Sequence, residues 1–525
     1  MAGLAMIVGD VIRRNATLYA DRIAYVCGER SITFGTFNQR VNRLANGLTA
    51  SGLVKGERFA LLLPTGIDLL EAYGACEKLG LIAVPMNMRL HAREVASILA
   101  DCEPSAMIYD VRFPEIVPGA GQRPDSLRSV YSINGSPLER DTIEYETLLA
   151  HGATAEPDGT ATPEDPLYLY YTSGTTGTPK GVLQTHRSAL NNARRYLIDL
   201  EVRHDEVPLA ASPLFHIGGR SMAFNYFYRS CTQHIMQNFD ADAFLQVAAR
   251  ASATALSCVP TTLKMILDSP ECVRADLRAV RSIFYSGSPA AAPILRAISE
   301  RFGDVLQQVY GMSETGPMIT VLRPEDHARA IARNDDRRLL SCGRPALDVE
   351  VRVVDEADHD VPPGGVGEVV IRSDSLMAGY WRMPELTAET MRGGWLHSGD
   401  VGAWDDEGFL YLVDRKKEMI VSGAENVYPR EVENVLYAHP GIAEVAVVGV
   451  PDERWGETVL AIIVPKAGAD LAVADVTAFC GERLAGYKKP RRIEFVTELP
   501  QNSIGKIDKK KLREKYWAAE ARNIG

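Results

Sequence analysis

The sequence lacks several features that would place it in other classes of protein. It has no apolar run approaching the roughly 20 residues that span a bilayer, so we expect no transmembrane segment. Its eight cysteines form no C-x-x-C pair, which argues against a disulfide scaffold or a structural zinc site. Basic residues are outnumbered, with 57 Lys and Arg against 68 Asp and Glu, and a net charge of −11 argues against nucleic-acid binding. Its first residues lack a basic, signal-like region, so we expect a cytoplasmic protein.

The length of 525 residues exceeds what one hydrophobic core can hold, so we expect at least two domains. Helical spacing over 37–51 and 68–79 alternates with apolar, strand-like runs at 58–63 and 82–85. This alternation favours layered α/β structure, and a second α/β run covers roughly 166–340. Residues 112–165 between the two runs are rich in Pro, Gly, Ser and Asp and are predicted to form a surface connection.

The last third of the chain has a different pattern. Strand-like segments at 349–355 and 367–373 flank a Pro-Pro-Gly-Gly turn, which predicts a small β-rich subdomain over about 345–412. Beyond it, helical patterns at 431–440 and 473–484 flank two apolar strands at 444–450 and 459–465. This second pattern predicts a smaller α+β domain.

A loop rich in Gly, Ser and Thr follows an aromatic, strand-like stretch, and residues 173–181 read SGTTGTPKG. Its glycines let the backbone approach an anion, and its hydroxyls and lysine can bind phosphate oxygens. The Walker motif is missing, which argues against an ordinary P-loop hydrolase. A flexible loop without a ligand is the alternative for a short fragment, but the full string predicts a phosphate site made of Thr172, Ser173, Gly174, Thr175, Thr176, Gly177, Lys180 and Gly181.

This loop closely resembles the signature of the adenylate-forming superfamily: acyl-CoA synthetases, aryl-CoA ligases, luciferases and peptide-synthetase adenylation domains. Further motifs of the family follow in the expected order over nearly the whole chain. The resemblance implies an α/β fold with a large N-terminal AMP-binding and acid-binding domain of layered subdomains over residues 1–413. It also implies a hinge at 414–417, with Lys417 at the hinge position, and a mobile C-terminal lid domain over 418–525.

The resemblance also assigns an ATP site. Residues 285–289 (YSGSP) resemble the segment that lines the adenine pocket, and residues 308–315 (QVYGMSET) are similar to the family's Y-G-x-T-E. WLHSGD at 395–400 and DRKKEMI at 414–420 resemble the segments that meet the ribose and phosphates. The implied nucleotide-binding residues are Gly287, Ser288, Pro289, Tyr310, Gly311, Ser313, Asp400 and Arg415, with Glu314 and Thr176 as ligands of Mg²⁺.

The catalytic lysine is expected near the end of the chain, where PQNSIGK at 500–506 resembles the family's P-x-T-x-x-G-K. When a carboxylate attacks the α-phosphate, two anions meet, and an ammonium group between them would offset the repulsion. A lysine in a basic tail is the alternative in the absence of the family context. The residues expected to take part in catalysis are Lys506, His216, Glu314 and Thr176.

A coenzyme A channel is implied by three further segments. SGAENVYP at 422–429 resembles the G-G-E-N stretch along which pantetheine runs, with Gly423 matching and Ala424 replacing the second glycine. Trp455 matches a tryptophan that stacks on the CoA adenine in some aryl-CoA ligases, although an aromatic packed in a core is the alternative. Residues 487–491, including Tyr487 and Lys489, match the neighbouring basic segment that can meet CoA phosphates.

The acid site is expected around PLFHIGG at 213–219, which resembles the aromatic-His segment bordering the acid in the family. His216 would lie beside the substrate carboxylate, and the pocket would continue along 220–228 into Phe284. A salt-bridged arginine is the favoured interpretation of Arg220, with contact to a polar group of the substrate as the alternative. The predicted pocket residues are Phe215, His216, Arg220, Tyr285 and Met312.

These motifs together predict an ATP-dependent acid–CoA ligase that works with Mg²⁺ and CoA on a fatty or aromatic carboxylic acid, as a monomer or homodimer. An adenylating enzyme that loads an acyl carrier protein is the main alternative. A luciferase-type oxygenase is less favoured, because the sequence has no peroxisomal tag and no distinctive match to a luciferin site. A nucleotide-binding regulator without catalysis is less favoured because Glu314, Asp400, Arg415 and Lys506 are all retained.

Overall fold

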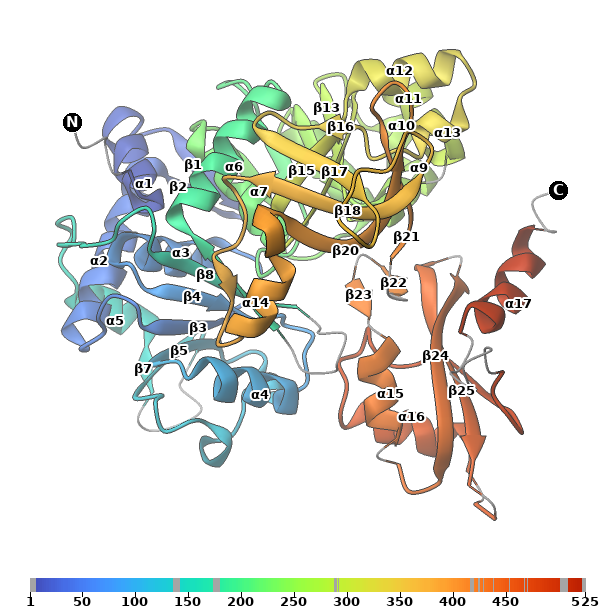
Figure 1. Ribbon diagram of the computed structural model, residues 1–525. Helices are drawn as coiled ribbons and strands as arrows, with labels where there is room; N and C mark the ends of the chain where they lie inside the picture. Colours follow the sequence, from blue (N-terminus) through green and yellow to red (C-terminus); the bar gives the residue numbers. More distant parts are fainter. Residues whose placement is uncertain are drawn as a thin grey trace.

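A computed structural model describes most of the chain. The described residues are 6–135, 142–172, 180–287, 290, 292–415, 420–423, 425–427, 429–437, 439–452, 454–466, 468–469, 471–500 and 509–521. They form a large N-terminal α/β part and a smaller C-terminal part at one side of it (Figure 1). None of the described helices is long and apolar enough to cross a membrane. The predicted fold class is confirmed.

The first large sheet of the N-terminal part has the order β16-β15-β14-β13-β12-β10-β11-β1-β2. Its centre is parallel from β14 to β1, and antiparallel strands close both edges. In the order of the sheet, the strands are β16 (Arg344–Pro345), β15 (Gly316–Leu322), β14 (Leu306–Met312), β13 (Ser282–Tyr285), β12 (Ala255–Cys258), β10 (Pro208–Ala210), β11 (Gln233–Ile235), β1 (Ile23–Cys27) and β2 (Arg30–Thr33).

The second large sheet has the order β19-β9-β8-β4-β3-β5-β6-β7. Strands β4, β3, β5, β6 and β8 are parallel neighbours, whereas β8, β9 and β19 pair antiparallel. The strands are β19 (Gly379–Tyr380), β9 (Lys180–Thr185), β8 (Pro166–Thr172), β4 (Ile82–Pro85), β3 (Arg58–Leu62), β5 (Ala106–Asp110), β6 (Ser129–Ile133) and β7 (Ile143–Glu144). Because β6, β7 and α5 (Tyr145–His151) lie within 112–165, that segment is part of the fold, and its prediction as a plain surface connection is wrong.

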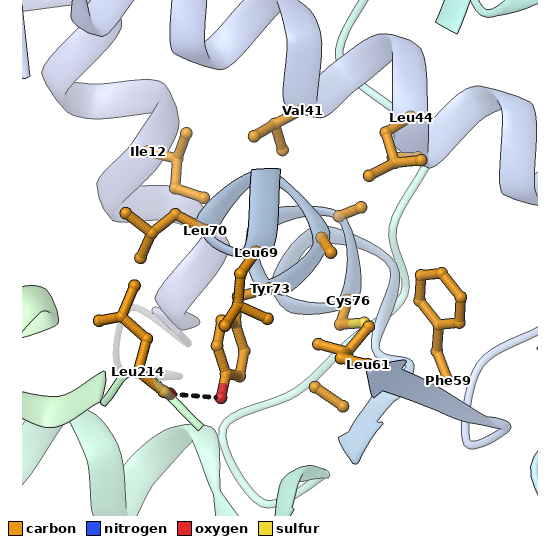
Figure 2. Packing of buried hydrophobic residues seen from close by; sticks show 14 of the residues in the cluster. Ile12, Val41, Leu44, Phe59, Leu61, Leu69, Leu70, Tyr73, Cys76 and Leu214 are labelled. Carbon is orange, nitrogen blue, oxygen red and sulfur yellow. Dashed lines mark hydrogen bonds between the residues drawn. The ribbon is translucent and has the colours of Figure 1, made fainter. Parts of the chain in front are cut away.

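Helices cover both sheets, and α3 (Ile67–Leu79) lies in the core near their junction (Figures 1 and 2). Nearly every residue of α3 is buried, and the Tyr73 phenol donates to the Leu214 carbonyl at 2.9 Å, joining α3 to the segment before α7 (Ile217–Tyr228). The other helices of this part are α1 (Val8–Leu18), α2 (Phe34–Ala50), α4 (Ala92–Cys102), α6 (His186–Asp199), α8 (Ala241–Arg250), α9 (Pro260–Asp268), α10 (Glu271–Arg274), α11 (Ala292–Phe302), α12 (Pro324–Ala332), α13 (Asp336–Leu339) and α14 (Pro384–Thr390).

Two smaller sheets follow along the chain. The first is an antiparallel meander of β17 (Val349–Val354), β18 (Val366–Ser373), β20 (Leu396–Trp404) and β21 (Leu410–Arg415). The second contains β22 (Ile420–Ser422), β23 (Glu425–Val427), β24 (Ile442–Asp452), β25 (Gly456–Pro465) and β26 (Arg492–Phe495), with α15 (Pro429–Tyr437), α16 (Val473–Gly481) and α17 (Lys509–Ala521) around it. The domain boundaries at 413 and 418 stay predictions.

The C-terminal part contacts the N-terminal part along α4 and the segment just before it. Ala485 packs into the apolar cluster formed by β4, α4 and their neighbours, and the Tyr487 phenol accepts a hydrogen bond from the Asn87 amide at 3.2 Å. The Lys488 ammonium pairs with the Glu94 carboxylate at 2.9 Å, and both side chains are largely buried. These contacts hold the C-terminal part against α4 and the segment that precedes it.

Candidate functional site

The predicted phosphate loop joins two neighbouring strands of the second sheet. Strands β8 and β9 run antiparallel, and Thr172 at the end of β8 is the register partner of Lys180 at the start of β9. The Thr172 hydroxyl donates to the Lys180 carbonyl at 3.4 Å. Residues 173–179, which include Ser173, Gly174, Thr175, Thr176 and Gly177, lie outside the described residues. The two strands therefore fix where the loop begins and ends.

A lysine, a tyrosine and a glutamate from distant segments meet beside this loop. The Lys180 ammonium lies 5.4 Å from the centre of the Tyr380 ring, and the Tyr380 phenol donates to Glu314 Oε1 at 2.9 Å. Tyr380 belongs to the short strand β19, which pairs with β9. The sequence reasoning missed Tyr380, because none of the motifs named above contains it and only the sheet brings it to Glu314.

Glu314 has the properties expected of a magnesium ligand. It follows strand β14 and is only 8% exposed, so its carboxylate faces the interior of the site. Magnesium normally takes one or two protein carboxylates and completes its shell with phosphate oxygens and water, so one such glutamate fits. Within the described residues, no group of three or more His, Cys, Asp and Glu side chains is placed to hold a metal by itself.

The predicted adenine and ribose residues are joined by a buried hydrogen bond. The Tyr310 phenol, on β14, donates to Asp400 Oδ2, on β20, at 2.5 Å, and both residues are at least nine-tenths buried. Asp400 is also the register partner of Arg415 on β21, so the backbone of Arg415 lies beside it. The hydrogen bond joins two sheets, and the pairing of β20 with β21 adds the backbone of Arg415 beside it.

The backbone around Tyr310 needs two glycines for different reasons. A Cβ on Gly311 would lie 2.4 Å from the carbonyl carbon of Pro317, so β14 and the following turn can approach this closely only without a side chain. Gly287 has a φ of +91°, which favours glycine, and open space where a side chain would lie.

Among the other predicted nucleotide-binding residues, Ser313 accepts a hydrogen bond at its carbonyl from the Gln184 amide at 3.2 Å. Ser288 and Pro289 lie outside the described residues.

His216 stands at the start of α7 and meets the C-terminal part. Its Nε2 lies 3.1 Å from Glu425 Oε2, and the other oxygen, Oε1, pairs with the Arg89 guanidinium at 2.9 Å. Burial raises the pKa of Glu425, but the opposing effect of His216, Arg89 and Lys488 is larger, so the pKa lies below its usual value. Glu425 is therefore a buried carboxylate held in its charged form by cations from both parts.

In the predicted CoA site, the Trp455 ring packs against two arginine guanidinium groups. Trp455 packs so closely on Gly423 that a Cβ there would lie 2.4 Å from its ring, and Gly423 has a φ of +59°. The guanidinium groups of Arg491 and Arg454 lie 4.3 Å and 4.8 Å from the ring centre. Trp455 is only partly buried, so it is not an aromatic enclosed in a core.

Other residues of the CoA prediction lie elsewhere. Tyr487 packs at the boundary between the two parts, and the Lys489 ammonium lies 3.8 Å from where a Cβ of Gly481 would stand, at the end of α16. Ala424, Lys417 and Lys506 lie outside the described residues, and their roles stay predictions.

A narrow pocket lies between α7 and the parallel strands β10, β11, β12 and β13, and its free volume is about 10 Å³. A cavity of this size holds about one water molecule, so an acid would enter only after side chains on its wall move. Met222 on that wall is unbranched and adapts readily. The side chains and backbone that line the pocket include Pro208, Ala210, Ser212, Leu214, Gly219, Met222, Ala223, Tyr226, Gln233, Ile235, Ser257 and Phe284.

Several predicted acid-site residues are not in this lining. Arg220 is 4% exposed and pairs with the buried Glu77, and its guanidinium lies 4.9 Å from the Tyr73 ring centre. These contacts agree with the interpretation of Arg220 as a salt-bridged arginine. Tyr285 points to the opposite face of its sheet, where its phenol is 2.8 Å from His327 Nε2.

Phe215 and Met312 lie at other positions near the site. Phe215 is buried with its ring 5.0 Å from that of His216, and Met312 packs against the cluster around Tyr310. Phe284 lines the pocket. Successive side chains of a strand point to opposite faces, so Tyr285, the next residue, points away from it. Strand alternation predicts that the two residues face opposite sides of the sheet, but it does not say which of them faces the pocket.

Family models match most of the chain. A model described as AMP-binding enzyme covers residues 12–381, and one described as AMP-binding enzyme C-terminal domain covers residues 431–506. The chain belongs to the family of AMP-binding enzymes. The resemblance to the adenylate-forming superfamily is thereby confirmed.

Curated relatives of similar length differ in the acid that they are named for. An indoleacetate–CoA ligase of Aromatoleum aromaticum is 35% identical over 97% of this chain and 98% of the relative. A feruloyl-CoA synthase of an Amycolatopsis species is 36% identical over 96% and 98%, and a long-chain-fatty-acid–CoA ligase of Mycobacterium tuberculosis is 35% identical over 97% and 99%. A fatty acid–[acyl-carrier-protein] ligase of Streptomyces coeruleorubidus is 34% identical over 95% of each chain.

Solved structures match nearly the whole chain. The amide bond synthetase of Marinactinospora thermotolerans has a TM-score of 0.87 at 31% identity over 97% of this chain and all of the other. The o-succinylbenzoate CoA synthetase of Bacillus subtilis is 30% identical and gives a TM-score of 0.83 in a double mutant bound with the product analogue OSB-NCoA, over 96% and 98% of the two chains. The same enzyme in complex with its acyl-adenylate OSB-AMP gives only 0.67, over 96% and 97%.

Proposed function

We propose that this AMP-binding enzyme is an acid–CoA ligase that forms an acyl-adenylate from a carboxylic acid and ATP, and then transfers the acyl group to CoA. One observation carries the proposal. Glu425, in the segment expected to guide pantetheine, contacts His216, beside which the substrate carboxylate is expected. A thiol that follows the first segment would thus arrive at the acid.

The first half-reaction joins the acid to the nucleotide. A carboxylate oxygen attacks the α-phosphorus of ATP, the new O–P bond forms, and pyrophosphate leaves. Asp400, held by the Tyr310 phenol, would accept hydrogen bonds from the ribose hydroxyls, and Lys506 would offset the charge of the reacting anions. A magnesium ion bound by Glu314 and Thr176 would neutralise charge on the phosphates.

The second half-reaction exchanges the nucleotide for a thiol. The CoA thiol loses its proton to solvent water, its sulfur attacks the acyl carbonyl carbon, and AMP leaves with the electrons of the broken acyl–phosphate bond. The higher TM-score to the complex with a CoA-product analogue than to the acyl-adenylate complex supports assigning the present arrangement to this step. A rotation about Lys417 would exchange this arrangement for one that brings Lys506 to the phosphates.

The acid class follows from the pocket and the relatives together. The pocket between α7 and the first sheet is mostly apolar, which suits an aryl or a fatty acid. The relatives named for indoleacetate, ferulate and long-chain fatty acids fall into the same two classes.

The test is to mix the purified protein with MgATP, CoA and a panel of benzoates, cinnamates and fatty acids of increasing length. Pyrophosphate and acyl-CoA are followed together, with Lys506→Ala as the control for contaminating ligases. Equal amounts of pyrophosphate and acyl-CoA from one acid class would support the proposal. Acyl-adenylate without thioester would favour the carrier-protein alternative, and no pyrophosphate from any acid would contradict both.

A further inference from the structure

The pocket between α7 and the first sheet has a polar side chain on an otherwise mostly apolar strand face. Ile235, Ala210 and Ser257 are register partners on β11, β10 and β12, so their side chains lie in one row on the face toward α7. Gln233 precedes Ile235 by two residues and therefore lies on the same face. It lines the pocket together with Tyr226 of α7.

The amide of Gln233 lacks part of its hydrogen bonding. Gln233 is 3% exposed, and its Nε2 is buried without a hydrogen-bond partner. Its register partner, Tyr25, lies beside it: burial raises the pKa of the Tyr25 phenol, and the nearby amide partly offsets that rise. The two groups nevertheless do not form a hydrogen bond that satisfies Nε2. A buried donor without a partner is destabilising, so native proteins usually pair such groups.

The position of Gln233 places this amide far from the reacting carboxylate. His216 precedes α7, and Tyr226 lies near the other end of that helix. Gly219 and Tyr226 both line the pocket, and seven residues of helix separate them by roughly 10 Å. The ring of Tyr25, the register partner of Gln233, stacks on that of Phe227, which follows Tyr226 near the end of α7, so Gln233 lies at that end of the pocket. An acid whose carboxylate lies beside His216 would therefore meet Gln233 at its other end.

We propose that Gln233 is a specificity-determining residue that selects carboxylic acids with a hydroxyl group at the end distant from the carboxylate. This inference rests on the proposed ligase function. A hydroxyl can accept a hydrogen bond from Nε2 or donate one to the amide oxygen, so it suits either orientation of the amide. A saturated alkyl chain would leave the amide unpaired, and a long one would exceed the span between Gly219 and Tyr226.

The test compares two acids that differ in one group. We would measure kcat/KM for pyrophosphate release with 4-hydroxycinnamate and 4-methylcinnamate, which have similar size. The unaltered enzyme should prefer the hydroxyl acid by about 10- to 100-fold, since a site that pairs a hydroxyl rejects the analogue that lacks it. Gln233→Met keeps the side-chain length and should reduce the preference to about threefold or less while retaining activity with unsubstituted cinnamate. Gln237→Met, at an exposed position four residues further on, should retain it.

The outcomes separate the two proposals. Equal rates for the two acids with the unaltered enzyme would overturn the role of Gln233, and so would an unchanged preference in Gln233→Met. Should Gln233→Met fail to fold, as judged by circular dichroism, the comparison of the two acids with the unaltered enzyme still decides. If no acid releases pyrophosphate, the ligase function fails, and calorimetric binding of the same two acids then decides the selection by Gln233 alone.

Discussion

The contact of Glu425 with His216 and Arg89 predicts that one charge on the C-terminal part controls the second half-reaction. Glu425→Gln keeps the size of the side chain and removes its charge. The glutamate side chain is 4% exposed, whereas those of His216 and Arg89 are 48% and 54% exposed. The free energy lost with this interaction should therefore be smaller than the roughly 3 to 5 kcal/mol lost on breaking a buried pair. It should be larger than the contribution of an exposed pair, which is below about 1 kcal/mol.

We take about 1 to 2 kcal/mol, because water can solvate the exposed His216 and Arg89 side chains once the charge of Glu425 is gone. This free energy favours the docked arrangement, so its loss should slow thioester formation roughly 5- to 30-fold. Adenylation should change little, since the same contact is absent from the arrangement proposed for that step. The assay adds CoA to the preformed enzyme–acyl-adenylate complex in a single turnover and follows acyl-CoA, while pyrophosphate release measures adenylation separately.

A pH series extends the same test. Because the docked structure holds the pKa of Glu425 below its usual value, its contribution to docking is complete above the usual carboxyl range and is lost as the pH falls through that range. The exposed Glu444 of β24 provides a matched control, and Glu444→Gln should leave both half-reactions unchanged. Equal slowing of the two half-reactions by Glu425→Gln, or of neither, would refute the reasoning.

Three further predictions concern the N-terminal part. Tyr310→Phe removes the donor to buried Asp400, so the KM for ATP should rise about tenfold with little change in kcat, measured by pyrophosphate release at varied ATP. Gly311→Ala forces a Cβ to within 2.4 Å of the backbone at Pro317 and should lower the free energy of unfolding by about 1 to 3 kcal/mol in urea. Burial lowers the pKa of His327 to about 4 from 6.5, so stability should fall as the pH drops between these values, and His327→Gln should flatten that dependence.

Much of the nucleotide site could be predicted from the sequence because its residues occur in short segments next to strands. Tyr310 ends β14, and Thr172 and Lys180 lie at the adjoining ends of β8 and β9. The aromatic, strand-like stretch before the loop predicted β8, whereas β14 was expected only as part of the α/β run over roughly 166–340, and the family's motifs supplied the expected roles. In the C-terminal part, helices α15 and α16 were predicted within a few residues because their periodicity is local, whereas α17 was not predicted.

The lining of the proposed acid pocket depended on information that local patterns lack. Whether Phe284 or Tyr285 faces α7 depends on the register of β13 against β12, and register is set by pairing between distant segments. Arg220 pairs with Glu77, 143 positions earlier, and the resemblance alone could not exclude it from the pocket. Gln233 had no motif to mark it.

The sequence by itself thus determined the fold class, the family and the order of the nucleotide-binding segments, because these depend on local periodicity and short motifs. Only the tertiary structure decided that Tyr380 meets Glu314, that Gln233 lies beside the acid pocket, and that Glu425 reaches His216. The physical reason is that burial and charge pairing between remote segments are properties of the packed chain. They become defined only when the sheets and the two parts of the molecule come together.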